Sequence, residues 1–514
     1  MRTRTLRPVR RWWVLAVLAV TQLMVALDVT VINIALPRAQ GALHFSTANR
    51  QWVITAYALA FGSLLLLGGR LSDLWGRRRT LVIGLVGFAL ASAVGGAADS
   101  FTVLVSARAV QGAFGALLAP AVLATLTTTF TRPHERATAF SVFVVVAGSG
   151  AAVGLLLGGA LTQWASWRWC LFINLAFAAI ALVGVVVFVG AGRATHATPL
   201  DLGGTVLGSG GLLLVVYGFA HAVTASWGAP TTWGSLVAGA LTVSGFVAWQ
   251  HRAVHPLLPL RVILNRIRAG SLVALFITSA GTFGVSLFLA YYLQTVLGYS
   301  PLRTGVAFLP LVAAIAVSAG VASARLLATV GPRPLVPAGM ILATLGMILF
   351  TRLTVQANYL GNVLPGLVVT GLGLGLILAP AIASATAGVR RVDAGAASAL
   401  VNAVQQIGGS VGVALLNTIA VSVSARAAAH ASSTSSRAAA GVNAARATLH
   451  GDAVAFWWAA GFFAVGTLVS AGLLPSGVPD HDATDAAQPA PSVDASTRPR
   501  RSRAGRVLRG TAGG

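Results

Sequence analysis

The chain has 514 residues, of which 56% are hydrophobic and only 9% carry a charge. Soluble globular proteins carry a charged fraction of about 25%, so this composition excludes a soluble protein and predicts an integral membrane protein. The net charge of +24 comes from 35 basic residues, all Arg, which stand in short clusters between apolar runs. Because these clusters do not follow one face, nucleic acid is not expected as a partner.

Fourteen long apolar runs recur along the chain, and each is long enough to cross a hydrocarbon core of about 30 Å as a helix. They cover residues 12–36, 51–69, 80–98, 102–128, 138–161, 169–190, 202–221, 232–250, 270–297, 304–327, 335–353, 360–385, 398–424 and 453–474. The sequence therefore predicts an all-α integral membrane fold with fourteen transmembrane helices.

The distribution of Arg predicts how these spans are oriented. An even number of spans places both termini on one side, and if this side is the cytoplasm, 26 Arg residues are cytoplasmic and eight are external, with Arg108 left inside a span. This bias agrees with the positive-inside rule. We expect a multi-pass protein of the cytoplasmic membrane with both termini cytoplasmic.

Few residues suggest a metal, redox or nucleotide site. Cys170 is the single cysteine, so neither a disulfide framework nor a CxxC metal pair is expected. The glycines of residues 371–375 lie inside an apolar run, with no strand before them and no Lys-Ser/Thr after them, which argues against a phosphate-binding loop. We expect no metal, no cofactor, no enzymatic activity and no direct use of ATP.

Asp28 lies inside the first apolar run, where a charge costs at least about 2.5 kcal/mol and usually serves transport. Arg108, in the fourth run, is the predicted partner of Asp28, and Gln111 shares its helix face. The alternatives are an Asp28 that only ties helices together and an Arg108 that binds only backbone carbonyls.

Residues 69–80 read Gly-Arg-Leu-Ser-Asp-Leu-Trp-Gly-Arg-Arg-Arg-Thr between the second and third runs. This segment resembles the signature loop of the major facilitator superfamily, G-x-L-x-D-x-x-G-R-[KR]-x. The resemblance implies a cytoplasmic charge relay that latches two helical bundles. The residues that it assigns to this gating loop are Gly69, Asp73, Gly76, Arg77 and Arg78.

Residues 27–37 read Leu-Asp-Val-Thr-Val-Ile-Asn-Ile-Ala-Leu-Pro, which resembles the signature L-D-x-T-[IV]-V-N-x-A-L-P of the fourteen-span drug:proton antiporter family. Arg108, Gln111 and Gly112 are similar to the superfamily's R-x-x-Q-G motif, in which the Arg is linked to proton transfer. With this resemblance, we expect Asp28 to carry a proton and Arg108 to modulate it. The resemblance implies two six-helix bundles, spans 1–6 and 9–14, and an inserted helix pair, spans 7–8. The expected divisions are a cytoplasmic tail (1–11), an N-terminal bundle (12–190), the inserted pair with its cytoplasmic linkers (191–268), a C-terminal bundle (269–474) with an outer loop (425–452), and a disordered cytoplasmic tail (475–514).

Gly150, Gly154 and Gly158 recur at intervals of four in the fifth run and predict close helix packing, together with Gly159. The segment resembles the antiporter motif G-x-x-x-G-P-x-x-G-G, except that Leu155 stands where the family has Pro. That motif is associated with export, so this departure leaves a proton-coupled importer of the same fold as an alternative.

The resemblance implies proton-coupled efflux of small amphipathic drugs or antibiotics by alternating access, with the lipid bilayer as surroundings and no obligatory protein partner. A non-transporting membrane sensor or scaffold is the other alternative. The acids inside the runs are limited to Asp28, which favours neutral or weakly charged lipophilic substrates. The cavity between the bundles is expected to be lined by Gln22, Asn33, Gln111, Asn402 and Gln405. The glycines that follow Gln405 are compatible equally with packing.

Overall fold

The structure is a computed structural model, and it describes residues 8–130, 132–190, 201–225, 227–253, 256–257, 264–322, 326–387, 389, 394–432 and 440–474. Every regular element in this part of the chain is a helix. The all-α fold predicted from the composition is therefore confirmed.

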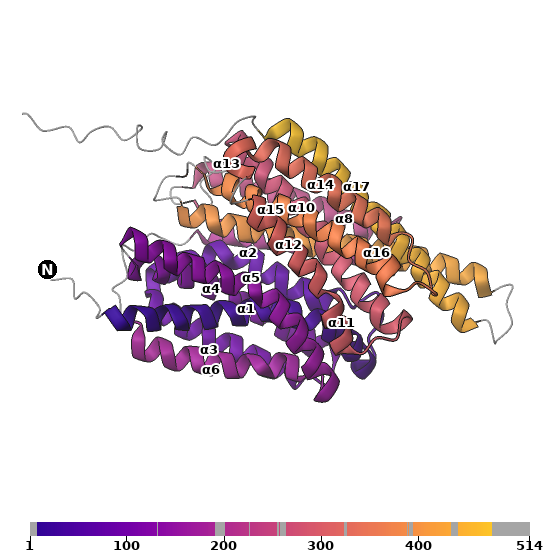
Figure 1. The fold of residues 1–514 in the computed structure, drawn as a ribbon, viewed down its shortest axis with the longest axis horizontal. Coiled ribbons are helices and arrows are strands. Elements are labelled where there is room, and N and C mark those ends of the chain that lie inside the picture. The colour runs from indigo at the N-terminus through magenta and orange to yellow at the C-terminus, as the bar shows by residue number, and fades with distance from the viewer. Residues whose placement is uncertain are drawn as a thin grey trace, which may run out of the picture. The chain divides into compact units, whose positions relative to one another are not determined.

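The first six helices form one bundle, which covers the first six predicted spans (Figure 1). They are α1 (Pro8–Leu43), α2 (Trp52–Trp75), α3 (Arg77–Gly96), α4 (Phe101–Thr129), α5 (Pro133–Trp164) and α6 (Trp169–Phe188). Within this N-terminal bundle α2 packs against α4, α1 against α5, and α3 against both α4 and α6. This pairing places α1 and α4, which carry Asp28 and Arg108, in the same bundle.

The helices from α10 onward form a second bundle (Figure 1). They are α10 (Arg266–Tyr291) with the π-helix η1 (Tyr292–Val296), α11 (Pro301–Ala307), α12 (Leu309–Val321), α13 (Leu327–Val330), α14 (Pro332–Phe350), the π-helix η3 (Tyr359–Val363) with α15 (Leu364–Thr386), α16 (Ala394–Ser432) and α17 (Ala440–Leu473). The α10 helix packs against α15, α16 and α17, and α14 packs against α15 and α17.

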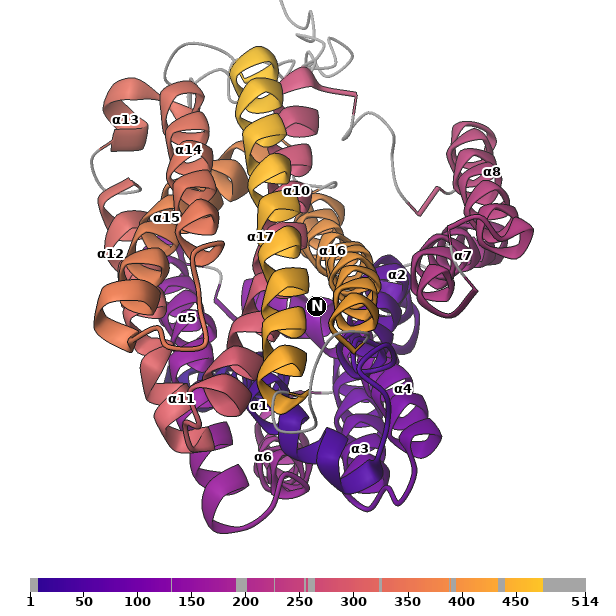
Figure 2. The same cartoon turned by 90° about the vertical axis from the view of Figure 1, so that its right-hand side faces the viewer.

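Two further helices, α7 (Leu202–Ala225) and α8 (Pro230–Arg252), pack against each other beside the bundles (Figure 2). The α7 helix contacts α2 and α16, and Leu59, Val216 and Ala414 form a small apolar cluster between the three helices. The Thr418 hydroxyl of α16 also donates a hydrogen bond to the Phe219 carbonyl of α7, at 2.8 Å. The inserted pair therefore lies against one helix of each bundle.

Asp201 lies directly before α7 and joins the two inserted helices. Its carboxylate accepts hydrogen bonds at 2.7 Å from the Gly204 amide, Trp249 Nε1 and Gln250 Nε2. Partial burial raises the pKa of the Asp201 carboxyl, but the hydrogen bonds outweigh burial and hold this pKa below its ordinary value. Asp201 is therefore a helix cap that also fixes α8, rather than a free acid.

Thirteen helical stretches of the described residues are long and apolar enough to cross a membrane. The α5 helix, which occupies the fifth predicted span, brings the predicted set to fourteen. The chain is therefore a multi-pass membrane protein.

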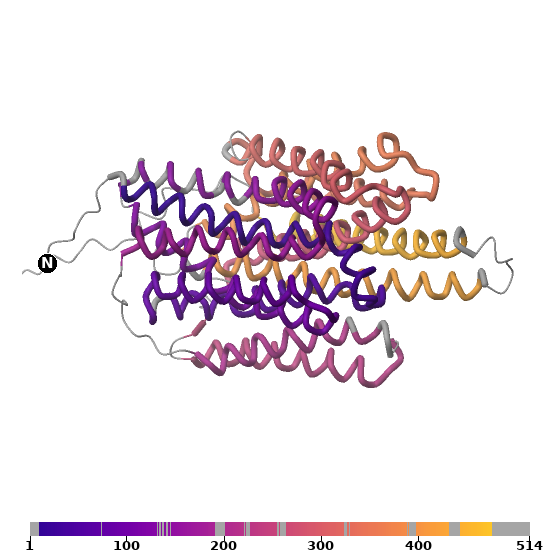
Figure 3. The backbone as a smooth tube through the Cα atoms, turned by 90° about the horizontal axis from the view of Figure 1, so that it is seen from below, coloured from indigo at the N-terminus to yellow at the C-terminus, as the bar shows by residue number. Residues whose placement is uncertain are grey.

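Two expected boundaries differ from the structure. The α1 helix begins at Pro8, within the expected tail 1–11, and Arg10 donates hydrogen bonds to the carbonyls of Val187 and Phe188. The expected outer loop 425–452 is helical where it is described, because α16 continues to Ser432 and α17 begins at Ala440 (Figure 3). Its many Ala residues, which carry little apolar surface, have the highest helix propensity. The tail 475–514 lies outside the described residues.

The glycine ridge of α5 packs against α1, as its spacing predicts. A Cβ atom added at Gly150 would lie 2.6 Å from the Ala26 Cβ, and one added at Gly158 would lie 3.0 Å from the Val31 Cα. The ridge therefore brings the backbone of α5 close to the helix that carries Asp28.

We expect Gly150→Ala to lower the apparent melting temperature of the purified protein, because overpacking typically costs about 1–3 kcal/mol. Gly148 lies on the same helix with no atom within 4 Å of its added Cβ, so it provides the matched control. Gly148→Ala should leave the melting temperature unchanged or raise it, since Ala favours a helix over Gly. Equal melting temperatures for the two variants would contradict the packing role.

Candidate functional site

Asp28 and Arg108 form an ion pair inside the N-terminal bundle. Arg108 Nη1 lies 2.6 Å from Asp28 Oδ2, and the two residues are 1% and 2% exposed respectively. The pair forms because the contacts of α1 with α4 bring two residues that are 80 positions apart in the chain onto facing helix surfaces. The structure thus brings together the two residues that the sequence predicts as partners.

Three polar side chains complete the surroundings of this pair. Gln111 Nε2 donates to Asp28 Oδ1 at 2.7 Å, and Asn174 Nδ2 donates to the same oxygen at 2.8 Å. The Gln111 amide also accepts from Arg108 Nη1 at 2.6 Å and donates to Ser92 Oγ at 2.7 Å. Asp28 is therefore held by donors from α4 and α6, and Ser92 links α3 to the same network.

The Arg108 guanidinium has further partners on α2. Its Nε donates to the Val53 carbonyl at 3.2 Å, and its central carbon lies 4.3 Å from the centroid of the Tyr57 ring. The aromatic face stabilises the cation by about 0.5–2 kcal/mol. Arg108 therefore binds a carboxylate, a ring and a backbone carbonyl together, so the alternative in which it binds only backbone carbonyls is wrong.

Two buried polar atoms beside the network have no hydrogen-bond partner among the described residues. They are the Tyr57 hydroxyl oxygen and Asn174 Oδ1. Each of these atoms can form one further hydrogen bond, for example with a water molecule. The arrangement can therefore hold a charge on Asp28 and also offers unused hydrogen-bonding capacity next to it.

The remaining predicted cavity residues lie apart from this network. Asn33 and Asn402 donate to carbonyls of their own helices, those of Val29 at 3.3 Å and Ser398 at 3.0 Å. Asn402 is exposed, whereas Gln22 and Gln405 are partly buried. Gln111, expected at the cavity, is instead buried in the Asp28 network. A shared cavity for these residues stays a prediction.

The α16 glycines that follow Gln405 lie against α10. Added Cβ atoms would lie 3.1 Å from the Phe276 Cα at Gly408 and 2.9 Å from the Phe283 ring at Gly409. This geometry favours packing over cavity lining at these glycines.

The predicted gating loop makes hydrogen bonds within the N-terminal bundle, and its Arg70 Nη2 also donates to the Pro256 carbonyl, in the connection before α10, at 3.0 Å. Arg77 Nη1 donates to the Thr128 hydroxyl at 2.7 Å, and Arg78 Nη2 donates to the Val186 carbonyl at 2.8 Å. Gly69 lies inside α2, which continues to Trp75, and Gly76, at φ 84°, makes the turn into α3. The Asp73 side chain lies outside the described residues.

The two bundles have one end that carries the gating loop and an opposite end that carries residues 44–51, the connection between α1 and α2. This opposite end is named the distal end. Hydrogen bonds join the two bundles at this end: Tyr291 donates to Gln40 Oε1 at 2.5 Å, and Gln294 Nε2 donates to the Ile34 carbonyl at 3.0 Å. A Cβ added at Gly159 would lie 2.7 Å from the Leu302 Cα, so α5 and α11 are also in close contact. These contacts close the distal end, whereas the described bonds of Arg77 and Arg78 do not cross between bundles.

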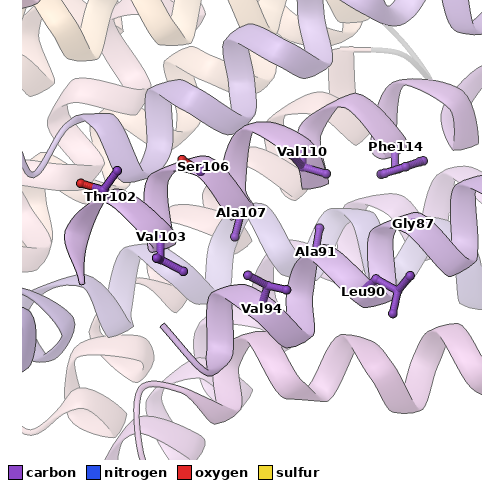
Figure 4. Close-up of a pocket in the computed structure, with 10 residues that line it drawn as sticks. All are labelled: Gly87, Leu90, Ala91, Val94, Thr102, Val103, Ser106, Ala107, Val110 and Phe114. Atoms are coloured by element: carbon purple, nitrogen blue, oxygen red, sulfur yellow. The ribbon is translucent and has the colours of Figure 1, made fainter. Parts of the chain in front are cut away.

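A groove of about 490 Å³ lies between α3 and α4 on the outside of the N-terminal bundle (Figure 4). It is lined mainly by apolar side chains, among them Leu90, Val94, Val110 and Phe114. Leu90 is 62% exposed, which suits a surface that contacts lipid. This groove lies apart from the Asp28 network.

The described residues contain no group of three or more His, Cys, Asp or Glu side chains that could hold a metal ion. The glycines of residues 371–375 lie inside α15 and pack closely against other helices. A Cβ added at Gly371 would lie 2.6 Å from the Leu311 carbonyl oxygen, and one added at Gly373 would lie 2.6 Å from the Gly339 carbonyl oxygen. They serve helix packing rather than phosphate binding.

The buried acid–Arg pair, the two bundles and the inserted helix pair agree with one protein family. The family model described as Major Facilitator Superfamily matches residues 18–413. The chain belongs to the Major Facilitator Superfamily. This superfamily consists of membrane transporters, so the chain is a membrane transporter by family.

Several relatives within the superfamily are named for resistance or export. The puromycin resistance protein pur8 of Streptomyces alboniger is 47% identical over 485 residues, which cover 94% of this chain and 95% of the relative. The cephamycin export protein CmcT of Amycolatopsis lactamdurans is 38% identical over 77% of this chain and 82% of the relative. The multidrug efflux pump LfrA of Mycolicibacterium smegmatis is 33% identical over 81% and 82%.

Solved superfamily structures share the fold. A bacterial homologue of the human lysosomal transporter Spinster, in an inward-facing and unoccupied conformation, has a TM-score of 0.64 at 16% identity and covers 91% of this chain and 98% of its own. The POT family transporter PepTSo has a TM-score of 0.66 at 15% identity and covers 91% of this chain and 98% of its own. At this identity the likeness shows the fold alone.

Sequence reasoning missed four residues of functional interest. Asn174 is the single Asn of its apolar run, a signal that could have identified it, whereas Ser92 and Tyr57 resemble ordinary packing residues in sequence. Asp452 was assigned to the outer loop, yet it lies inside α17 and is only 7% exposed. Asp452 is therefore a second buried acid within a helix, outside the apolar runs in which Asp28 is the only acid.

A double-mutant cycle can measure the coupling between Asp28 and Arg108. Asp28→Asn and Arg108→Gln each leave an unpaired buried charge, so each should destabilise the purified protein by about 3–5 kcal/mol. The double variant should lose clearly less stability than the two single losses combined, because it buries no charge. Thermal unfolding in detergent gives all four values, and strict additivity would show that the pair is not coupled.

Proposed function

We propose that the chain exports small amphipathic compounds across the cytoplasmic membrane in exchange for protons, by alternating access of two bundles. The observation that supports this proposal is the buried Asp28–Arg108 pair, a titratable acid within a helix of a multi-pass protein. An acid at this depth usually belongs to a proton or substrate pathway. The relatives named for antibiotic resistance and export support the outward direction.

The geometry suggests how Asp28 would exchange a proton. While Arg108 Nη1 remains 2.6 Å from Asp28, the carboxylate is compensated and has no need of a proton. A movement of α4 relative to α1 that withdrew the guanidinium would leave a buried carboxylate, which would then bind a proton. Gln111 and Asn174 would hold Asp28 in place through this change, because their amides donate to its other oxygen.

The contacts between the bundles suggest which state the structure represents. They join the bundles at the distal end through Gln40, Gln294 and their partners, while the described bonds of Arg77 and Arg78 stay within the N-terminal bundle. With the gating loop on the cytoplasmic side, as the Arg distribution predicts, this state is closed to the outside. The opposite state would engage the gating loop as the inner latch.

The charge balance at Asp28 favours one class of substrate. A carboxylate already paired with Arg108 has no net negative charge to offer a cationic drug. Neutral or weakly charged lipophilic compounds therefore suit the proposed site better than dications do.

Import of a substrate with protons is the second candidate, because Leu155 replaces the Pro of the antiporter motif and α5 continues as a helix from Pro133 to Trp164. Everted vesicles separate the two candidates. In everted vesicles the cytoplasmic face of the protein points outward. With an acidic vesicle interior, a proton-coupled exporter should therefore accumulate its substrate inside the vesicles, whereas an importer would expel the same compound.

Asp28→Asn should reduce proton-driven accumulation in everted vesicles at least about tenfold, since removing a group that acts in proton transfer typically costs 10²–10⁴-fold. Asp99→Asn is the matched control, because Asp99 is an exposed acid in the turn between α3 and α4. Accumulation of a lipophilic dye and the accompanying proton release provide the two readouts. Full activity of the Asp28 variant would exclude Asp28 as the proton carrier.

Arg77→Ala should slow the same transport about tenfold, because a loss of about 1.4 kcal/mol of latch energy changes the equilibrium between states by that factor. Arg79→Ala is the control from the same Arg run, since Arg79 is exposed. Transport rates are compared at equal amounts of membrane-inserted protein. Identical rates for the two variants would mean that residue 77 has no gating role.

A further inference from the structure

Arg50 is a buried cation at the distal end that lies outside the Asp28 network. It stands in the connection before α2 and is 3% exposed. Its Nε donates to Asn417 Oδ1 of α16 at 2.9 Å, and its guanidinium carbon lies 4.4 Å from the Tyr291 ring centroid and 5.5 Å from that of Phe288, both on α10. One cation of the N-terminal segment is therefore held by two helices of the other bundle.

A third helix of the C-terminal bundle supplies the opposite charge. Asp452 of α17 is 7% exposed and makes no ion pair within 4 Å among the described residues, so the Arg50 charge acts on its carboxylate from beyond direct contact. The preceding Gly451 packs against Ser424 and Ala420 of α16, which fixes the depth of Asp452 in the bundle. Burial of a carboxylate is costly unless an opposite charge compensates it, and this charge comes from the other bundle.

The contact is reciprocal. Asn417 Nδ2 donates to the carbonyls of Thr47 and Ala48, at 3.5 and 3.4 Å, so it binds the backbone of the same connection that carries Arg50. Tyr291, whose ring lies against Arg50, also donates its hydroxyl proton to Gln40 of α1. The connection between α1 and α2 is thus bound to the C-terminal bundle through several groups around one cation.

We propose that Arg50 and Asp452, with Asn417 and Tyr291, form a distal latch that holds the two bundles together in the state described here. This inference rests on the alternating access of the proposed function, and it assigns the residues that set the balance between its two states. Opening of the distal end separates Arg50 from all of its C-terminal partners and exposes both charges to water. Neutralising Arg50 weakens its contacts with Asn417 and Tyr291 and removes the charge that offsets Asp452, so the closed state loses stability relative to the open one. Neutralising Asp452 removes only the more distant opposite charge and should have a smaller effect.

Spin-label distances across the distal end test the latch. Labels attached through Ala97→Cys and Thr354→Cys, two exposed positions in the distal turns of the two bundles, report their separation in a Cys170→Ser background. Arg50→Gln should raise the ratio of long to short distances about tenfold or more, as loss of a buried charged partner does at interfaces. Asp452→Asn should shift the ratio in the same direction by a smaller factor.

Arg303→Gln is the matched control. Arg303 is an exposed distal Arg whose guanidinium carbon lies 3.9 Å from the Tyr299 ring centroid, so its stacking stays within one bundle. This variant should keep the distance distribution of the unsubstituted protein. Arg50→Lys should give an intermediate ratio, because it keeps the charge but loses the planar contacts with Asn417 and Tyr291.

The latch is excluded if Arg50→Gln and Asp452→Asn both leave the distances as in the control. If Arg50→Gln does not purify as a folded, monodisperse protein, the Asp452→Asn distances decide alone. The distance measurement needs no transported compound, so its outcome is separate from that of the proposed function. A distal shift in a protein that exchanges no protons would support the latch and overturn only the proton-coupled export.

Discussion

The need to compensate one buried carboxylate organises the N-terminal bundle. Asp28 accepts hydrogen bonds from Arg108 and Gln111 on α4 and from Asn174 on α6. An unpaired charge at this position would cost several kcal/mol. The three helices α1, α4 and α6 must therefore pack so that Arg108, Gln111 and Asn174 reach Asp28. This packing is possible because Gly150 and Gly158 allow α5 to approach α1 closely and Gly112 allows α4 to lie against the backbone of Tyr57.

The same physical requirement recurs between the bundles with a different result. The Asp28–Arg108 pair lies entirely within one bundle, so it separates only when α4 moves relative to α1 inside that bundle. Arg50, by contrast, has its described partners on the other bundle, so its compensation depends on the relative position of the two. The first pair therefore depends on the packing within the N-terminal bundle, and Arg50 depends on the packing between the bundles.

Much of the fold was predictable from the sequence, because hydrophobic runs of membrane length and the Arg bias between them are strong signals. The pairing of Asp28 with Arg108 was also predictable, since few charges lie inside the runs and each needs a partner. Asp452 and Arg50 were not found, because both stand in segments that look like loops in sequence. The Ala-rich segment before Asp452 contains little apolar surface to reveal a helix, and tertiary contacts with α16 decide its burial.

The cavity residues were the least predictable part of the site. An amide inside an apolar run has several ways to be satisfied, and sequence alone does not distinguish them. Asn33 and Asn402 bond to their own helices, whereas Gln111 bridges Arg108, Asp28 and Ser92. Which of these outcomes occurs depends on the helix rotation, and that is fixed by contacts between residues far apart in the chain.

The position of α7 has a consequence for the surface that the protein presents to the bilayer. Because α7 covers the seam between α2 and α16, with Val216 and Phe219 contacting both sides, this flank is shielded from the bilayer. The seam on the opposite flank, where α5 meets α11 and α12, has no such covering helix in the described part of the chain. The protein therefore presents two different flanks to the acyl chains, a seam covered by α7 on one side and a seam closed only by the packing of α5 against α11 and α12 on the other.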